Sequence, residues 1–174
     1  MQIINLDIGG AKLYIPEVKT DTRGSFVEKM NTSMFDDLQI KQINQSISHK
    51  NVFRGFHFQD KPYQQAKYIW VESGKIYDII INVDSNSNFY KKSLVIELDS
   101  KNNRHLFIPK GFAHGFISVM NNTKVCYAVD SFYNPSSDTG INFDDKSLKI
   151  DWPTDKSKLL ISEKDKNLPF LNEK

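Results

Sequence analysis

The chain has 174 residues, of which 39% are hydrophobic and 25% are charged, as in an ordinary globular protein. Its formal net charge is +2, without a run of five like charges, which is too weak a bias to argue for a polyanionic partner, so we expect no nucleic acid as ligand. The single Cys126 excludes an internal disulfide and a multi-cysteine zinc site. We expect one domain spanning residues 1–174.

The first residues, Met1 to Asn5, lack the basic region and the long apolar stretch of a signal peptide. No apolar run in the sequence approaches the ~20 residues that cross a bilayer. Together with the lone cysteine, these features predict a cytoplasmic protein that has no membrane partner.

Short β-rich segments, separated by Asn, Ser and Gly, dominate the chain. Thr32 or Ser33 is expected to cap a short helix that continues to Leu38. Two strands are expected to form a hairpin about Gly74, and the apolar triplet at 159–161 is expected to pack the C-terminal segment on the body. Many short strands with turns between them predict an all-β sandwich, jelly roll or barrel. The predicted strands are residues 12–15, 25–30, 41–48, 67–71, 76–83, 93–98, 105–108, 115–119 and 124–129.

Four histidines are present, and two of them lie in distinctive surroundings. His57 stands in Arg54-Gly55-Phe56-His57-Phe58-Gln59. On a regular strand Arg54 and His57 would face opposite ways, unless Gly55 makes a bulge. From these residues alone, His57 is either a proton carrier or a barrel histidine bonded to a backbone carbonyl. His114 follows the constrained turn Pro109-x-Gly111.

Several short motifs run along almost the whole chain. Pro109-x-Gly111-x-x-His114 is similar to the second cupin motif. The other motifs are Asp21-x-Arg23-Gly24-x-Phe26 with Glu28, Gln42-x-Asn44-x-Ser46, Arg54-Gly55-x-His57-x-Gln59, Pro62-x-x-Gln65-x-Lys67, Gly74-x-x-Tyr77-Asp78, Phe107 to Phe116, Tyr127, Tyr133-x-Pro135, Asp144-Asp145 and Ile150 to Pro153. In their number, order and spacing, these motifs resemble those of the dTDP-4-dehydrorhamnose 3,5-epimerase family.

The resemblance implies a cupin jelly-roll β-barrel with a few short helices, working as a homodimer without cofactor or metal. The implied reaction inverts C3 and C5 of a nucleotide-linked 4-keto-6-deoxyhexose, in the deoxysugar synthesis of a bacterial surface glycan. Such a reaction needs a base, an enolate stabiliser and an acid. The resemblance assigns these roles to His57, oriented by Asp165, to Lys67 and to Tyr127. The His57–Asp165 pair requires the C-terminal tail to fold back.

The implied substrate contacts come from basic, polar and aromatic side chains. Arg23 and Arg54 suit a diphosphate because guanidinium groups pair with phosphate oxygens. Phe26 and Tyr133 match aromatics that enclose the nucleobase, partly from a neighbouring subunit. The remaining contacts are Glu28, Gln42, Asn44 and His114.

Three departures from the family pattern, at Ile43, Trp70 and Phe132, leave the nucleobase, the sugar and the extent of epimerisation open. The alternatives are a C3-only or C5-only epimerase, a ketoisomerase using a related nucleotide sugar, and a non-catalytic sugar-binding protein. A metal-dependent cupin is disfavoured because His57-Phe58-Gln59 stands where such enzymes have His-x-His.

Overall fold

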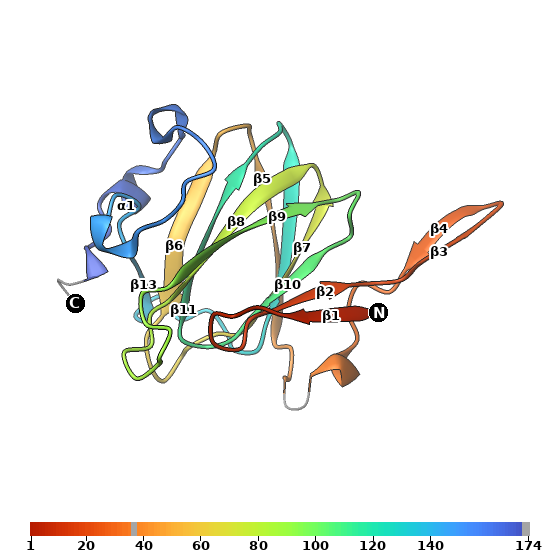
Figure 1. Cartoon of the computed structure of the whole chain (residues 1–174), viewed down its shortest axis with the longest axis horizontal. Coiled ribbons are helices and arrows are strands. Elements are labelled where there is room, and N and C mark those ends of the chain that lie inside the picture. Colours follow the sequence, from red (N-terminus) through yellow and green to blue (C-terminus); the bar gives the residue numbers. More distant parts are fainter. Residues whose placement is uncertain (36–37, 172–174) are drawn as a thin grey trace.

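The computed structural model describes residues 1–35 and 38–171, which form two β-sheets packed face to face and a hairpin that extends from one end (Figure 1). The strands are β1 (Gln2–Asn5), β2 (Lys12–Ile15), β3 (Val18–Asp21), β4 (Gly24–Val27), β5 (Gln42–Ser48), β6 (Phe53–Gln59), β7 (Lys67–Ser73), β8 (Lys75–Asn82), β9 (Ser93–Asp99), β10 (His105–Ile108), β11 (Phe112–Ser118), β12 (Thr123–Val129) and β13 (Asp138–Gly140). The helical elements are the 3-10 turns η1 (Thr32–Met34), η2 (Lys146–Leu148) and η3 (Lys156–Lys158), and the short helix α1 (Glu163–Lys166).

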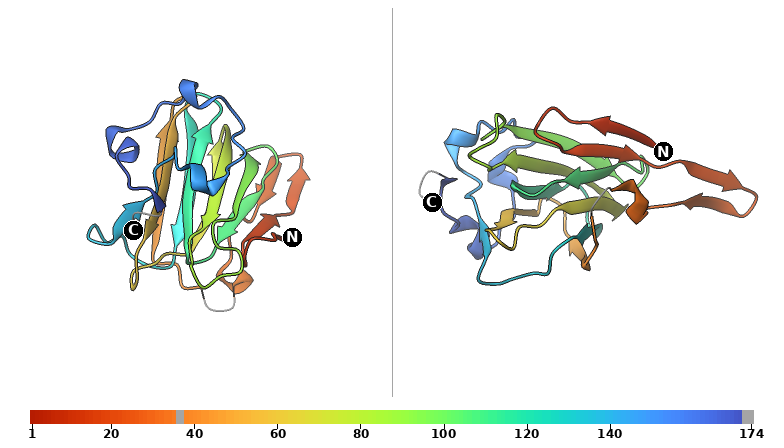
Figure 2. Two further views of the ribbon diagram at one scale, coloured as in Figure 1. Left: turned by 60° about the vertical axis from the view of Figure 1, so that its left-hand side comes forward. Right: turned by 90° about the horizontal axis from the view of Figure 1, so that it is seen from below.

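The six-stranded sheet has the order β1-β2-β10-β7-β12-β5, and the five-stranded sheet has the order β13-β6-β11-β8-β9 (Figure 2). The consecutive strands β7 and β8 lie in different sheets, so the predicted hairpin about Gly74 is wrong. A single residue connects these two strands, whereas the common tight hairpin has a two-residue loop. Gly74, with a φ of 88°, instead turns the chain from one sheet into the other.

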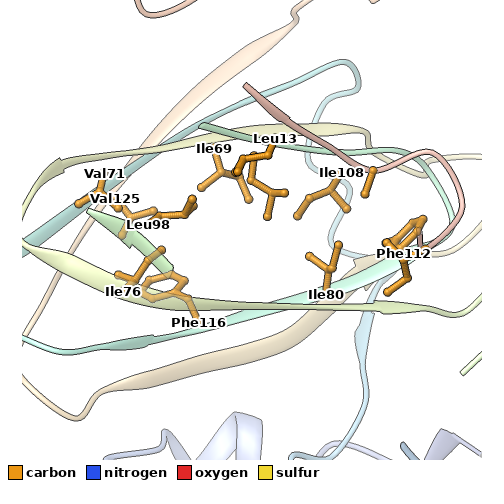
Figure 3. Close-up of a cluster of buried hydrophobic side chains, with 13 residues drawn as sticks. Leu13, Ile69, Val71, Ile76, Ile80, Leu98, Ile108, Phe112, Phe116 and Val125 are labelled. Carbon is orange, nitrogen blue, oxygen red and sulfur yellow. The ribbon is translucent and has the colours of Figure 1, made fainter. Parts of the chain in front are cut away.

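The main core lies between the sheets (Figure 3). Ile69 and Val71 of β7 share one face of their strand, and Ile76 and Ile80 of β8 oppose them. Each of these side chains is at most 2% exposed. Burial of this apolar surface is the main force that holds the two sheets together.

A second apolar layer covers the outer face of the five-stranded sheet. Ile79 and Ile81 of β8 point to this face, which explains why β8 reads as a continuous apolar run. The chain beyond β13 packs here, as the blue segment beside β6 shows (Figure 1). Leu159 and Ile161 join this cluster, as predicted, while the side chain of Leu160 is 58% exposed.

The hairpin β3–β4 projects from the end of the molecule opposite α1 (Figures 1 and 2). The turn that follows it is shorter than the predicted helix. Asn31, rather than Thr32 or Ser33, caps η1, because its side chain accepts a hydrogen bond from the Ser33 N–H at 3.0 Å. Phe35 already has extended backbone, and residues 36–37 of the predicted helix lie outside the described residues.

Candidate active site

A bulge in β6 turns Arg54 and His57 to the same side of the sheet. His57 pairs with His114 and Arg54 pairs with Phe116, so three positions on β6 span two on β11. Gly55 is the extra residue: its φ is 141°, and a Cβ there would lie 2.6 Å from the Gly115 Cα. The alternative that the sequence left open, a bulge at Gly55, is therefore confirmed. It brings a guanidinium and an imidazole to one cleft.

The backbone at the bulge also bonds to the C-terminal helix. Asp165 of α1 accepts a hydrogen bond from the Gly55 N–H at 3.1 Å, and its Oδ1 lies 3.2 Å from Nε2 of His57. The tail thus folds back as the resemblance requires. Burial disfavours the Asp165 carboxylate, but the bonds from His57 and Gly55 outweigh it and hold the pKa of Asp165 below its ordinary value.

The ring of His57 has a carboxylate at one nitrogen only. Its Nδ1 is buried and has no hydrogen-bond partner among the described residues. A carboxylate at Nε2 keeps the proton of the neutral ring there, which leaves the lone pair on Nδ1. His57 is therefore not the carbonyl-bonded barrel histidine that the sequence left possible.

Lys67 and Tyr127 approach the cleft from the six-stranded sheet, on the neighbouring strands β7 and β12. Burial lowers the pKa of Lys67 from 10.5 to about 8, against the opposing charges of Asp78 and Asp138. Nζ of Lys67 lies 3.5 Å from the carbonyl oxygen of His57. Burial also raises the pKa of Tyr127, so its phenol is neutral at pH 7 and able to donate a proton.

His114 lies beside this group and is paired with a buried acid. Its Nε2 is 2.9 Å from Oδ2 of Asp78, whose side chain is completely buried. Burial lowers the pKa of His114, although Asp78 opposes the shift. An inaccessible carboxylate needs partners, and Asp78 has His114 as a direct neighbour and the Lys67 charge nearby.

The cleft consists of two adjoining hollows that share His57, Lys67, Tyr127 and Lys164. We name them by size. The larger hollow, of about 770 Å³, is also lined by Ser46, Val52, Phe53, Arg54, His114, Phe116, Leu159, Leu160, Ile161, Ser162, Asp165 and Lys166. The smaller hollow, of about 390 Å³, is also lined by Gln42, Asn44, Phe58, Gln59, Gln65, Tyr133 and Asp138.

Three predicted binding residues lie away from this cleft. Arg23 and Phe26 are on the projecting hairpin, where Arg23 pairs with Asp21 at 2.6 Å and Phe26 is 68% exposed. Glu28 directly follows that hairpin and lines neither hollow. The described chain by itself therefore brings together the predicted catalytic residues but not these three.

Sequence reasoning missed three charged residues of the site. Asp78 belongs to a matching motif but had no assigned role. Lys164 precedes Asp165, which was the only signal for it, and nothing in the sequence pointed to Asp138. Oδ2 of Asp138 accepts hydrogen bonds from Nζ of Lys164 at 2.7 Å and from the Tyr133 hydroxyl at 3.2 Å.

Two further observations concern residues 1–35 and 38–171 only. They contain no group of three or more His, Cys, Asp or Glu side chains placed to hold a metal ion. The helices among them are all too short to cross a membrane.

Fold and site together define a cupin-type jelly roll in which an imidazole–carboxylate pair, a partly buried ammonium and a phenol line one cleft. A base, a cation and an acid in one cleft are typical of an isomerase that removes a proton from carbon and returns one. The family model for dTDP-4-dehydrorhamnose 3,5-epimerase matches residues 5–173. The chain belongs to the dTDP-4-dehydrorhamnose 3,5-epimerase family.

Individual members of the family are similar to this chain over nearly its whole length. The chain is 39% identical to the dTDP-4-dehydrorhamnose 3,5-epimerase of Methanothermobacter thermautotrophicus, over 99% of this chain and 95% of that one. The chain also resembles the crystal structure of the dTDP-4-dehydrorhamnose 3,5-epimerase from Bacillus anthracis with TDP and PPi bound. The two have a TM-score of 0.92 and 36% sequence identity, and the match covers 97% of this chain and 98% of that one. A dTDP-4-dehydrorhamnose 3-epimerase of Streptomyces niveus is 31% identical to this chain, over 99% of this chain and 85% of that one.

Proposed function

We propose that this protein epimerises a dTDP-linked 4-keto-6-deoxyhexose at C3 and C5, converting dTDP-4-dehydro-6-deoxyglucose to dTDP-4-dehydrorhamnose. The observation that carries the proposal is the His57–Asp165 contact in a cleft that Lys67 and Tyr127 also line. Membership of the family supports the substrate class. The lone Cys126, free of any disulfide, supports a cytoplasmic location.

His57 acts as the base in this proposal. It takes a proton from the carbon next to the ketone. The imidazolium that forms is stabilised by Asp165, whose depressed pKa keeps it ionised at neutral pH. The same base serves C3 and C5 in turn, as the sugar is presented to it in two orientations.

Lys67 and Tyr127 complete the proton transfer. The electron pair released at carbon moves to the ketone oxygen, where the partly buried Lys67 ammonium stabilises the enolate. Tyr127 then protonates the carbon from the other face. The cycle closes when His57 gives its proton to solvent and Tyr127 regains one from solvent. No oxidant, reductant or covalent intermediate is needed, since one proton leaves and one returns.

The substrate contacts follow the lining of the two hollows. Arg54 lies in the larger hollow, with its guanidinium held by Ser48 Oγ at 3.0 Å and by the carbonyl oxygen of Ile47 at 3.2 Å. We assign it to the diphosphate. His114 contacts the sugar in the same hollow, and Gln42, Asn44 and Tyr133 contact the nucleoside in the smaller one.

We further propose a homodimer in which each β3–β4 hairpin reaches the cleft of its partner. A projecting hairpin with a 68% exposed Phe26 and a 43% exposed Val18 is an unfavourable arrangement for an isolated chain. Insertion into a second copy would bring Arg23, Phe26 and Glu28 to a cleft. The exposed Ile43 and Ile47 of β5 offer additional apolar surface for the interface.

The proposed function is tested by proton NMR of dTDP-4-keto-6-deoxyglucose with the protein in deuterated water. We expect deuterium at both C3 and C5. His57→Ala should abolish the exchange, whereas His49→Ala, which changes an exposed histidine outside both hollows, should leave it intact. In Tyr127→Phe we expect exchange to persist while inversion falls by ~10²-fold or more, because the base remains and the acid is lost.

The positions at which deuterium appears distinguish a 3,5-epimerase from the alternative, a mono-epimerase. The Streptomyces niveus relative named as a 3-epimerase favours a mono-epimerase as the second candidate. Deuterium at one carbon only would establish that candidate. Without exchange at either carbon, although the substrate binds, the protein would be a sugar-nucleotide-binding member of the family.

A further inference from the structure

A buried group of hydrogen bonds, outside both hollows, joins the β3–β4 hairpin to the body. The carbonyl oxygen of Lys29, two residues beyond the end of β4, accepts a hydrogen bond from the Tyr68 hydroxyl at 3.1 Å and lies 2.9 Å from Nδ1 of His105. Tyr68 and His105 lie on the neighbouring strands β7 and β10 and are 0% and 1% exposed. None of the three residues lines either hollow of the cleft.

The proton positions in this group follow from its acceptor. A carbonyl oxygen can only accept, so the 2.9 Å contact requires a hydrogen on Nδ1 of His105. Nε2 of this ring is buried and has no hydrogen-bond partner among the described residues, which fits a neutral ring with its lone pair at Nε2. Burial lowers the pKa of His105 to about 4, with the Lys29 charge adding to the shift, and burial raises the pKa of Tyr68. At neutral pH both side chains are therefore uncharged donors to one carbonyl.

Both ends of the hairpin meet at these side chains. On the β4 side, Lys29 is held a second time through Nζ, which donates to Oδ1 of Asn103 at 3.2 Å. On the β3 side, the preceding strand β2 pairs with β10, and Tyr14 of β2 lies directly opposite His105. The rings of Tyr14 and Tyr68 pack edge to face, with centroids 5.5 Å apart. These contacts fix the direction in which the hairpin leaves the body (Figure 1).

Small changes at this base become large at the far end of the hairpin. From Lys29 to Arg23 the chain runs six residues, or about 20 Å at ~3.3 Å per residue of extended strand. A rotation of about 5° at Lys29 would therefore move Arg23 by about 2 Å. A misplacement of ~1 Å in a substrate-positioning group already reduces activity strongly. Glu28 directly precedes Lys29, so its position depends on the same bonds.

We propose that Tyr68 and His105 anchor the hairpin through the Lys29 carbonyl, and that they are positioning residues for the cleft of the partner subunit rather than for their own. They hold the three predicted substrate contacts of the hairpin at the angle at which these enter that cleft. Tyr68 directly follows Lys67, but successive side chains of a strand point to opposite faces, so Tyr68 faces away from its own cleft. The inference rests on the proposed function only in taking the hairpin to serve the partner.

Steady-state kinetics of the homodimer measures the effect of each donor. Tyr68→Phe keeps the ring and removes one donor, so kcat/KM should fall about fivefold. His105→Leu removes the other donor and should lower kcat/KM about tenfold. His105→Asn retains an N–H close to the position of Nδ1 and should restore most of the wild-type value. Tyr90→Phe, at an exposed tyrosine outside both hollows, is the matched control and should change nothing.

The decisive measurement uses a mixed dimer that has one working site. One chain carries His57→Ala and supplies the hairpin, and the other carries Arg23→Ala with Phe26→Ala and supplies the cleft. Tyr68→Phe in the chain that supplies the hairpin should lower the activity of the purified mixed dimer about fivefold. The same substitution in the chain that supplies the cleft should leave the activity within about twofold, because the hairpin of that chain is already inactive.

A general weakening of the barrel would act from either chain, and most of all beside Lys67 of the working cleft. Equal losses from the two placements, or no loss from either, would overturn the anchor and leave the proposed function standing. If His105→Leu does not fold, Tyr68→Phe carries the comparison, with urea denaturation of each mixed dimer as the check of folding. An inactive mixed dimer without further substitutions, from an active wild type, would overturn the exchange of hairpins and the anchor with it.

Discussion

Lys67 places a titratable ammonium where the proposed enolate forms. Burial brings its pKa to about 8, with the carboxylates of Asp78 and Asp138 opposing the shift. The protonated amine is the form that stabilises an enolate. Activity should therefore be retained below this pKa and lost as the pH rises through it.

We expect kcat to fall above about pH 8 in a pH–rate profile. In Lys67→Arg the fall in kcat should move to a pH too high to measure, because a guanidinium stays charged to above ~12.

The free energy of unfolding should rise over the pH range in which kcat falls. The unfolded chain holds the lysine proton up to 10.5, so the contribution of Lys67 to the free energy of unfolding grows between about pH 8 and 10.5. A fall in kcat that coincides with loss of folded protein would contradict this assignment.

Helix α1 presents Asp165 to His57 but has only four residues, Glu163–Lys166. A helix of this length is unstable alone, so it depends on its contacts with the body. Its first turn is capped by Ser162, whose Oγ accepts a hydrogen bond from the Asp165 N–H. Asp165 also reaches the Gly55 N–H, which ties α1 to the bulge of β6.

Ser162→Ala should lower the free energy of unfolding by about 1 kcal/mol, the usual effect of losing an N-cap. It should also reduce kcat, because Asp165 is then less well held against His57. Ser162→Thr retains a capping hydroxyl and should preserve both quantities. Urea denaturation and steady-state kinetics measure the two effects. A stability loss with unchanged kcat would show that the position of Asp165 does not depend on the cap.

At the scale of the whole molecule, the proposed site is divided between the body and the β3–β4 hairpin. If the hairpin serves the partner's cleft, two different inactive chains can complement one another. One chain carries His57→Ala and an intact hairpin, and the other carries Arg23→Ala with Phe26→Ala and an intact His57–Asp165 pair. In a mixed dimer, one of the two sites then has both sets of wild-type residues.

Co-expression of the two chains with different tags should therefore restore about a quarter of the wild-type activity in a random mixture, whereas each chain alone stays inactive. Affinity purification of the doubly tagged dimer should enrich that activity. Light scattering on the wild-type protein checks the dimer itself. A monomeric wild type, or mixed dimers without activity, would exclude exchange of hairpins between subunits.

Much of the fold was readable from the sequence because strand formation has a local signature. The predicted segments 12–15 and 105–108 coincide with β2 and β10, and 41–48 differs from β5 by one residue. Each of these strands is a short β-rich run bounded by turn-forming residues, which a short window of sequence reveals. The family motifs likewise named His57, Lys67, Tyr127 and Asp165 as candidates.

Tertiary structure alone decided which strands pair and how the tail that carries Asp165 and Lys164 docks on the body. Gly74 looked like a hairpin turn, but β7 pairs with β10 and β12 while β8 pairs with β9 and β11, since the two strands bury facing surfaces in the same core. The contact between His57 and Asp165 spans 108 positions of chain, and the Lys164–Asp138 pair depends on how α1 docks. Such contacts follow from burial of apolar surface summed over the whole chain, which no local pattern encodes.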